Sequence, residues 1–475
     1  MSDDNYDLNF YDENYDSLKK LKTLRDKVDW EIEERHEFLH QLDPLFSSWK
    51  GRLPDLQDFF RAVEMDWLLI EVINDPWRKY NKNQFIDFVI RTGYKDEPEV
   101  DKYGQPLLHR YTPVHCAARL RYYAIVGNLF KIYDKFDVNY IDEAGLTHFH
   151  VACKFELLDI IEKFLELGQG ADCLVGQESY ESTIDPPLHY ALFDGQKEVT
   201  RLLLRSGADP NSVDAEGSAP LHIICKRVQF LDDDLAELFF EINDELDQLV
   251  RIDAKDNTGR TPLQCAVASL ASNTVDVLLK RGADLSSFVF PTEDYFGVKF
   301  DHNIWNEFKM RLLSDALAIV AHLEKRGYEL ERSDATTIMN FFSKQRLFDK
   351  PVHLENHWYD DVTFARRAKE LMIIPSAMSL YDLMRLRHEE AEKILTYSDY
   401  SRFVNSKEWG RIPRRYRVAC DTHLCEIVSR GFFWYWALES FVELTRNRLP
   451  MLCCECIIDR LTNEDLFRIF LAASD

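Results

Sequence analysis

The chain has 475 residues, too many for a single compact core, so it must contain several domains or an extended array of repeats. Hydrophobic residues make up 46% and charged residues 29%, the composition of a folded protein and not of a disordered one. Lys and Arg number 58 against 82 Asp and Glu, and the resulting formal charge of −24 repels phosphate backbones and anionic lipid. We therefore expect neither nucleic acid nor a membrane as a partner.

Residues 1–50 are predicted to be an acidic N-terminal tail and a charged lead-in helix around residues 30–42. The lead-in contains His36-Glu37-Phe38-Leu39-His40, which fits the zinc-protease pattern and on a helix puts two imidazoles one turn apart. A zinc hydrolase built on His36 and His40 is thus the alternative from the enzyme class. The sequence offers no evident third ligand or substrate cleft, so we predict no metal, no cofactor and no catalytic residue.

A six-residue pattern of the type Thr-Pro-Leu-His-x-Ala recurs five times in the middle of the chain. The copies are residues 112–117, 147–152, 186–191, 219–224 and 261–266, at intervals of 35, 39, 33 and 42 residues. A Thr hydroxyl at the first position caps a helix, and Pro at the second suits a first turn whose N–H needs no partner. The period predicts stacked helical repeats.

Two further markers keep a constant order around this pattern. Endings with Gly-Ala-Asp, at residues 203–211 and 278–284, supply a glycine suited to a helix C-cap. Asp-x-x-Gly sequences at 142–145, 214–217 and 256–259 precede the pattern and predict tight turns at hairpin tips.

Together these markers resemble the ankyrin-repeat family over residues 51–348. The resemblance implies an all-α solenoid of helix pairs joined by short hairpin loops, with five recognisable repeats and degenerate capping repeats at both ends. Residues 85–94, preceded by a helix at 56–63, and residues 316–328 would be such caps. In this family the motif histidines hydrogen-bond to turns and connect neighbouring repeats, which assigns a structural role to His115, His150, His189 and His222.

The same resemblance places target contacts on hairpin tips and first-helix surfaces, where exposed side chains can vary without harming the core. Their acidic bias favours a basic or mixed patch on the target. The predicted target-binding residues are Tyr140, Asp142, Glu143, Asp214, Glu216, Lys255, Asn257 and Arg260.

Residues 349–475 lack the repeat markers and are predicted to form a separate helical domain. Helical periodicity covers residues 362–372, 379–395, 419–429 and 432–446, and no strand alternation is evident. Cys453, Cys454 and Cys456 lie in an apolar helix without a second pair at zinc-finger spacing, so packing is favoured over a metal site.

The last segment matches the spacing of an F-box, with a Leu-Pro start, an Ile-Ile pair, a Leu three residues on and a final Asp-Leu. Ankyrin repeats followed by such a shortened hairpin resemble the PRANC family, in which this segment docks on a Skp-type adaptor of cullin-RING ubiquitin ligases. The residues that the resemblance assigns to adaptor binding are Leu449, Pro450, Ile457, Ile458, Leu461, Asp465 and Leu466.

We interpret the chain as a protein–protein interaction adaptor whose repeats bind a target protein and whose C-terminus recruits a ubiquitin ligase. The alternative is a non-catalytic binding protein or inhibitor that sequesters a signalling protein without a ligase. Ten cysteines scattered among apolar neighbours, an acidic start and no apolar run near ~18 residues predict a cytoplasmic or nuclear protein with reduced thiols.

Overall fold

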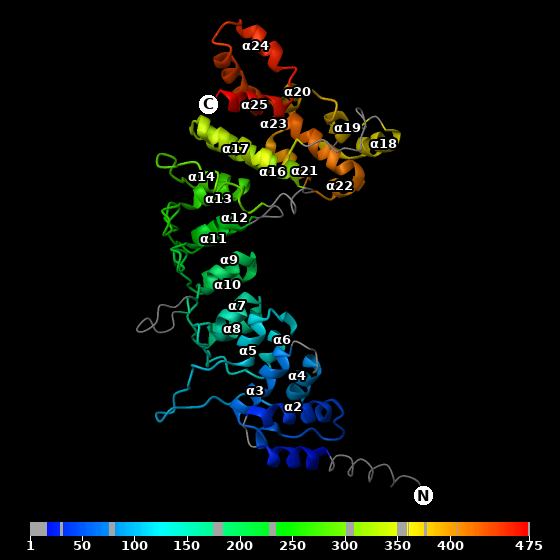
Figure 1. Cartoon of the computed structure of the whole chain (residues 1–475). Helices are drawn as coiled ribbons and strands as arrows, with labels where there is room; N and C mark the ends of the chain where they lie inside the picture. Colours follow the sequence, from blue (N-terminus) through cyan, green and yellow to red (C-terminus); the bar gives the residue numbers. More distant parts are fainter. Residues whose placement is uncertain are drawn as a thin grey trace. The chain divides into compact units, whose positions relative to one another are not determined.

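The computed structural model describes residues 17–28, 32–75, 81–173, 184–227, 234–300, 308–348, 359, 361–374, 378–404 and 406–473. The chain forms two compact units, Met1–Ala215 and Glu216–Asp475. Both consist mainly of helices (Figure 1), which confirms the predicted all-α class of an ankyrin-type solenoid followed by C-terminal helices. In the described part of the chain, no helix has the length and apolar character needed to cross a membrane.

The first unit is built from short helix pairs. Residues 17–27 are helical, and the following elements are α2 (Ile32–Ser47), η1 (Leu56–Asp58), α3 (Ala62–Asn74), α4 (Lys82–Arg91), α5 (Pro113–Arg119), α6 (Tyr123–Leu129), α7 (His148–Lys154), α8 (Leu158–Glu166), α9 (Pro187–Asp194) and α10 (Lys197–Arg205). Helices α5, α7 and α9 begin at the six-residue motifs and pack on one another in sequence order. Each is followed by the second helix of its repeat.

A further helix pair, where a degenerate capping repeat was predicted, precedes these pairs, and its first helix begins later than expected. Helix α3 packs on α4 and α5, and α4 packs on α6, so the pair continues the stack. Of the predicted helix at 56–63, residues 56–58 form only a 3-10 turn, capped by Asp55, whose side chain accepts the Gln57 N–H at 3.0 Å. The N–H of Arg61 donates to Glu64 at 2.9 Å and starts the helix proper at Ala62.

The second unit contains two further repeats and the C-terminal helices. Its elements are α11 (Pro220–Lys226), α12 (Leu235–Glu245), α13 (Pro262–Ala268), α14 (Ser272–Lys280), α16 (Lys309–Lys325), α17 (Arg332–Lys344), α18 (Val362–Glu370), β1 (Met372–Ile374), β2 (Met378–Ser379), α19 (Leu380–Leu383), α20 (His388–Ile394), α21 (Tyr397–Val404), α22 (Lys407–Gly410), α23 (Arg414–Leu444), α24 (Met451–Ile458) and α25 (Asn463–Ala472). Helix α11 packs on α13, α12 on α14, and α14 on α16.

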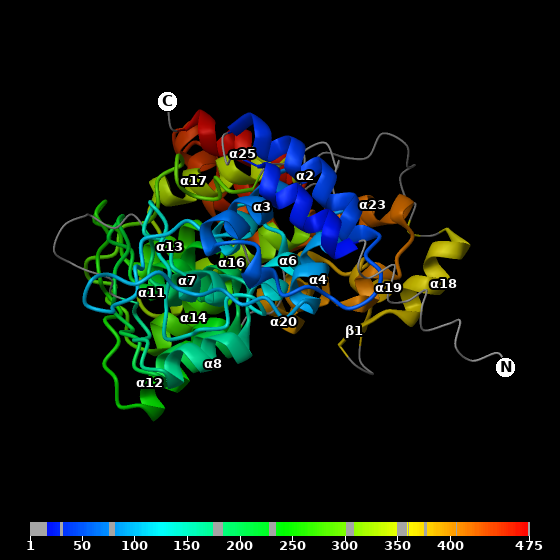
Figure 2. The same cartoon turned by 90° about the horizontal axis from the view of Figure 1, so that it is seen from below.

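The C-terminal helices share a core with the pair α16–α17 that follows the last repeat. The backbone N–H groups of Lys309 and Met310 at the start of α16 each donate to the buried Asp421 of α23 at 3.0 Å. Arg332 of α17 donates to the carbonyl of Phe470 at 3.2 Å, and α17 and α25 lie side by side in Figures 1 and 2. The domain boundary placed at residue 348 stays a prediction, and the helices on its two sides are packed together.

Several C-terminal elements differ from those predicted. The helices expected at 419–429 and 432–446 are one continuous helix, α23, because no proline interrupts it between Pro413 and Pro450. The helix expected at 379–395 is broken, since Ser379 caps the short α19 and Arg387 starts α20 separately. A small antiparallel sheet, β1–β2, pairs Met372 with Ser379 and had no signal in the sequence.

Candidate protein-binding surfaces

Three motif histidines, His115, His150 and His222, hold the first turn of their own repeats. The Nδ1 atom of His115 accepts the backbone N–H of Thr112 at 3.1 Å, and His150 makes the same contact with Thr147 at 3.3 Å. Burial lowers the pKa of both imidazoles to about 4, so they are neutral acceptors near neutral pH. These histidines belong to the scaffold that positions the hairpins.

His222 additionally connects two repeats. Its Nδ1 accepts the N–H of Ala219 at 3.1 Å, and its Nε2 donates to the carbonyl oxygen of Arg260 at 2.9 Å. Arg260 directly precedes the cap of the next repeat, so this bond fixes the backbone at the following hairpin. His189 is also buried.

Asp142, predicted to contact a target, is instead a structural residue of its hairpin. Its Oδ1 accepts the N–H groups of Ala144 and Leu146, both at 2.9 Å, and its Oδ2 pairs with Arg119 of the preceding repeat at 2.8 Å. Only 3% of the residue is exposed. An Asp at a hairpin tip turns inward when it can close the turn by accepting backbone N–H groups, and this explains the burial of a residue that we expected to be exposed.

Asp256 occupies the place equivalent to Asp142 in the hairpin three repeats later, and it behaves in the same way. Its Oδ1 accepts the N–H groups of Thr258 and Arg260, both at 3.0 Å, and its Oδ2 pairs with Lys226 of the preceding repeat at 3.3 Å. Burial raises the pKa of Asp256, but these hydrogen bonds and the charge of Lys226 outweigh it and bring the pKa to about 2.

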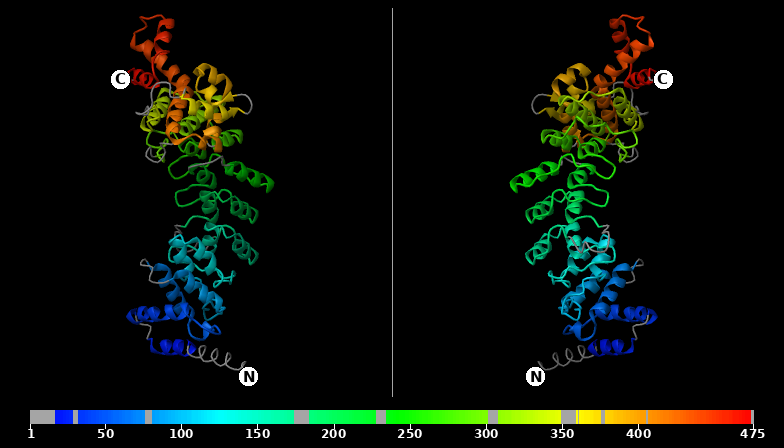
Figure 3. Two further views of the ribbon diagram at one scale, coloured as in Figure 1. Left: turned by 90° about the vertical axis from the view of Figure 1, so that its right-hand side faces the viewer. Right: turned by 90° about the vertical axis from the view of Figure 1, so that its left-hand side faces the viewer.

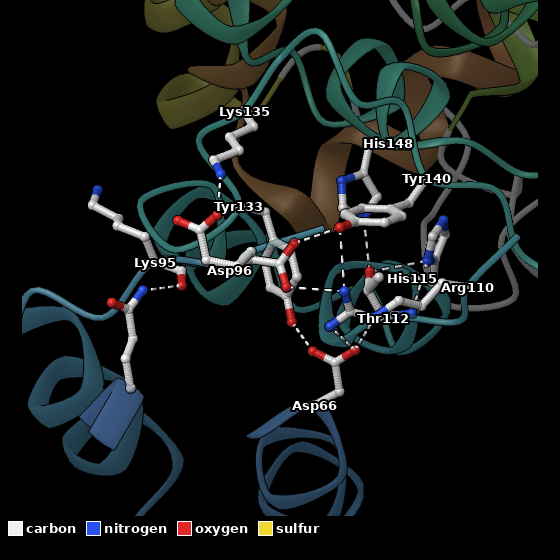
Figure 4. Close-up of polar contacts among 12 residues, drawn as sticks. Asp66, Lys95, Asp96, Arg110, Thr112, His115, Tyr133, Lys135, Tyr140 and His148 are labelled. Atoms are coloured by element: carbon white, nitrogen blue, oxygen red, sulfur yellow. Dashed lines mark hydrogen bonds and ion pairs between the residues drawn. The ribbon is translucent and has the colours of Figure 1, made fainter. Parts of the chain in front are cut away.

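Tyr140, also predicted at the target surface, is buried in an ion network (Figure 4). The Arg110 guanidinium pairs with Asp66 at 2.5 Å and Asp96 at 2.9 Å, and the Tyr140 hydroxyl donates to Asp96 at 2.5 Å. The Tyr133 hydroxyl donates to Asp66. Burial raises the pKa of Asp66 to about 6, although Arg110 and the Tyr133 hydrogen bond act against this. The network connects the degenerate first repeat to the next ones.

The sequence held little indication of this network, because its members lie outside the repeat markers. The buried His148 beside it was also missed, although it stands where Pro occurs in most copies of the motif. Its Nε2 lies 2.7 Å from the Thr112 hydroxyl (Figure 4). The histidine in place of that Pro was the one feature of the sequence that could have indicated this buried contact.

The other predicted target-binding residues remain accessible. Asp214 and Arg260 are half-buried, and the exposed ones are Glu143, Glu216, Lys255 and Asn257. They stay candidates for target contact.

Another candidate surface position lies two residues after each six-residue motif, at or near the end of the first helix of the repeat. Its side chain is accessible in four of the five repeats. The eighth residue of the repeat pattern is Arg119, Lys154, Phe193, Lys226 and Ala268 in the successive copies, and only Ala268 is buried. Three of the five are basic in a chain whose net charge is −24. Phe193 is 68% exposed.

At the C-terminus, the structure separates the predicted adaptor-binding residues into an inner and an outer set. Ile458 and Leu466 are fully buried, so their side chains are not available to a partner in this conformation. Arg430 of α23 donates to the Ile458 carbonyl at 2.8 Å and caps the end of α24. Asp465 accepts the Thr462 N–H at 3.1 Å and caps α25, while Leu461 is half-buried.

The outer set lies on α24 and directly before it, and α24 protrudes from the other C-terminal helices in Figure 3. Leu449 is 39% and Ile457 40% exposed, and Pro450 is exposed as well. Sequence reasoning missed Met451 and Leu452, which are 54% and 74% exposed.

The cysteines of α24 do not all pack as expected. Cys454 is buried, whereas Cys453 and Cys456 are exposed. The outer surface of α24 is thus apolar and carries two thiols.

The two histidines of the zinc-protease pattern lie on α2. His36 stands edge-on to Trp67 with ring centroids 5.4 Å apart, and its Nδ1 is 3.8 Å from the Glu71 carboxylate. Among the described residues, neither His36 nor His40 belongs to a group of three or more potential metal ligands.

Comparison with known proteins identifies the repeats. The family model described as "Ankyrin repeats (3 copies)" matches residues 186–288. This stretch includes three of the five motif copies, so the chain contains ankyrin repeats, modules that typically bind proteins and are not themselves catalytic.

Curated proteins with similar sequences share only a part of their length with this chain. The human B-cell lymphoma 3 protein is 30% identical over 153 residues, 31% of this chain and 31% of that protein. The Arabidopsis thaliana E3 ubiquitin-protein ligase KEG is 27% identical over 164 residues, 34% of this chain and 9% of that protein. The human BCL-6 corepressor-like protein 1 is 33% identical over 137 residues, 28% of this chain and 7% of that protein. The chain thus spans about a third or less of these relatives.

Proposed function

We propose that this chain is a non-catalytic adaptor that brings a target protein to a cullin-RING ubiquitin ligase. In this proposal the ankyrin repeats bind the target through their exposed hairpin residues. The C-terminal F-box-like hairpin of α24 and α25 binds a Skp-type adaptor of the ligase.

The observation that carries the ligase half is the exposed apolar surface of α24 and of the residue Leu449 before it. Leu449, Met451, Leu452 and Ile457 are between 39% and 74% exposed on a helix whose inner face is already packed. Full burial of a side chain of this size is worth ~1.5–3 kcal/mol, so several exposed residues of this kind on one short helix are typical of a binding surface. The Leu-Pro start and the spacing of the Ile-Ile pair make an F-box partner the proposed occupant.

The surface is also held in a fixed position, which lowers the entropic cost of binding. Arg430 donates to the carbonyls of Ile458 and Leu461, at 2.8 and 2.5 Å, and so anchors the end of α24. Trp434 of α23 donates to Asp459 at 2.9 Å.

The alternative is a binding protein that sequesters a signalling protein without recruiting a ligase. The burial of Ile458 and Leu466 favours it, because two of the seven predicted adaptor contacts are occupied by the chain's own core.

The test is capture of a purified Skp-type adaptor by the full-length chain. Leu452→Asp places a charge on the proposed surface, and we expect capture to fall by at least about tenfold, the loss of roughly 1.4 kcal/mol. Val362→Asp on α18 is the matched control, since both residues are 74% exposed. Both variants should melt at the wild-type temperature, because neither side chain is in the core.

If the wild-type chain captures no adaptor, the ligase half of the proposal is wrong and the alternative stands. Equal capture by the Leu452 variant and the wild type would instead exclude the outer surface of α24. Point substitutions are better here than deletion of residues 449–475, which would uncover the part of α23 that packs on α25.

A further inference from the structure

Three cationic residues lie near one another in the second unit, and one of them is stacked on a tyrosine ring. Lys226 ends α11, Arg260 directly precedes α13, and Tyr295 and Lys299 lie in the segment after α14. The Arg260 guanidinium carbon is 3.8 Å from the centroid of the Tyr295 ring, and Lys299 donates to the backbone carbonyl of Lys226. We call these four residues the Arg260 cluster.

The orientation of the cluster is fixed by bonds to the repeat scaffold. Tyr295 donates its hydroxyl to Cys265 of α13 at 3.3 Å, which holds the ring under the guanidinium. The carbonyl of Arg260 is held by His222 at 2.9 Å, and the Lys226 ammonium donates to Ser218 at 2.8 Å. The cations are therefore positioned before any partner arrives.

The charges of the cluster are not balanced by the chain itself. Lys226 pairs with Asp256 at 3.3 Å, and that carboxylate also accepts two backbone N–H groups. Within the described residues, no carboxylate lies within ion-pair distance of Arg260 or Lys299, and the Arg260 guanidinium donates no hydrogen bond. A guanidinium group has five N–H donors in one plane, and when it is stacked on an aromatic ring it is well placed to form bidentate hydrogen bonds with a carboxylate or a phosphate.

We propose that the Arg260 cluster binds an acidic segment of the target protein, with a carboxylate held by Arg260 and a second one near Lys299. The inference rests on the proposed function, in which the repeats bind a protein, and it adds the chemistry of the partner. It also differs from the expectation of a basic or mixed target patch, because the side chains of this cluster that carry charge are cationic. Nucleic acid is the weaker candidate, since a net charge of −24 opposes a long polyanion.

The test is a fluorescence-anisotropy titration of the full-length chain with a short labelled peptide that alternates glutamate and glycine. We expect Arg260→Gln to weaken binding of this peptide by about tenfold, and Arg260→Lys to weaken it less, because Lys keeps the charge but loses the fork. Lys280→Gln is the matched control: it also removes one cation, but from α14, where Lys280 pairs with Asp276 at 2.7 Å. It should bind within about twofold of wild type.

Three further probes define the partner. A peptide with glutamine in place of glutamate should not bind. A glutamine peptide carrying one phosphoserine, if it alone binds, would replace the carboxylate partner by a phosphorylated one and overturn the proposal as stated. A single-stranded DNA oligomer that binds more tightly than the glutamate peptide, with the same dependence on Arg260, would overturn the choice of a protein partner.

Failure of this inference can be told from failure of the proposed function. If the glutamate peptide does not bind, or if the Arg260→Gln and Lys280→Gln variants bind it equally, the inference is wrong, whatever the adaptor does. Arg260→Gln leaves α24 unchanged, so capture of the Skp-type adaptor should persist in this variant. Adaptor capture absent from the wild-type chain, with peptide binding intact, would refute the ligase half alone.

Discussion

Arg110 and Arg260 each lie over a tyrosine ring, but with opposite surroundings. In the first unit, Arg110 is 5.1 Å from the Tyr140 ring and pairs with Asp66 and Asp96, all within the protein interior (Figure 4). In the second unit, Arg260 is 3.8 Å from the Tyr295 ring and has no carboxylate partner among the described residues. The same pair of residue types thus forms a closed internal network in one place and an open cationic surface in the other.

The comparison shows that the neighbouring carboxylates, and not the cation or the ring, decide the role. An arginine whose donors are taken by buried acids stabilises the fold, and its loss leaves those acids without a counter-charge. An arginine held in place by scaffold bonds but without an acid has its charge available to a partner. Substitutions can test each side of this difference, beginning with the largest expected effect.

Arg110→Met should destabilise the first unit by ~3–5 kcal/mol, because Asp66 and Asp96 would remain buried without their cation. Urea unfolding followed by circular dichroism would measure the loss at pH 7. The loss should shrink toward pH 5, since the pKa of Asp66 is already about 6 with Arg110 present and must rise further without it. A destabilisation below about 1 kcal/mol would mean that the network contributes little to the fold.

The repeats could be predicted from the sequence because their signals are local. The Thr, Pro and His positions of the motif each act within one helical turn, and the structure places α5, α7, α9, α11 and α13 at the five copies. The fold class followed from the period of these markers together with their resemblance to the ankyrin-repeat family.

The surfaces could be predicted only in part, because burial depends on partners far away in the chain. Tyr140 reads as a hairpin residue, but its hydroxyl meets Asp96, which is 44 residues earlier. Ile457 and Ile458 are adjacent and chemically alike, yet one is 40% exposed and the other is packed beneath α23. Periodicity identifies a helix, whereas the choice of its buried face is made by the helix that packs on it.

Acidic pH should reveal the buried state of the motif histidines. Burial holds the pKa of His150 at about 4 in the folded chain, against 6.5 as the reference value for the unfolded one. As the pH falls from 6.5 to 4, the unfolded state takes up the proton first, so this residue costs stability in that window, about 3 kcal/mol at most. Above pH 6.5 this histidine is neutral in both the folded and the unfolded state, so it no longer lowers the free energy of unfolding.

His150→Gln should remove this dependence while keeping the cap, because the fifth repeat already uses Gln264 at the same place. There the Thr261 N–H donates to the Gln264 side chain at 3.0 Å. The free energy of unfolding of the variant should therefore fall less than that of wild type between pH 6.5 and 4. His109→Gln, at an exposed position before α5, is the control and should follow the wild-type curve.

Asp142→Ala should cost ~1–3 kcal/mol, since it removes the acceptor of two backbone N–H groups and the partner of Arg119. The neighbouring Glu143→Ala should change the stability by less than about 0.5 kcal/mol, because Glu143 is exposed. Thermal melts of the two variants would compare them directly. Equal melting temperatures would make Asp142 a candidate target contact again.

The smallest effect is expected at Arg260, and it decides whether the open cluster is a surface or part of the scaffold. Arg260→Met should change the free energy of unfolding by no more than about 0.5 kcal/mol, because the loss of a stack worth ~0.5–1 kcal/mol is offset by relief of repulsion from Lys226 and Lys299. A double-mutant cycle with Tyr295→Leu should give a coupling below about 1 kcal/mol in urea unfolding. A loss above about 2 kcal/mol would place Arg260 in the same class as Arg110. Weaker peptide binding by its variants would then reflect a damaged fold, and the comparison between the two arginines would fail.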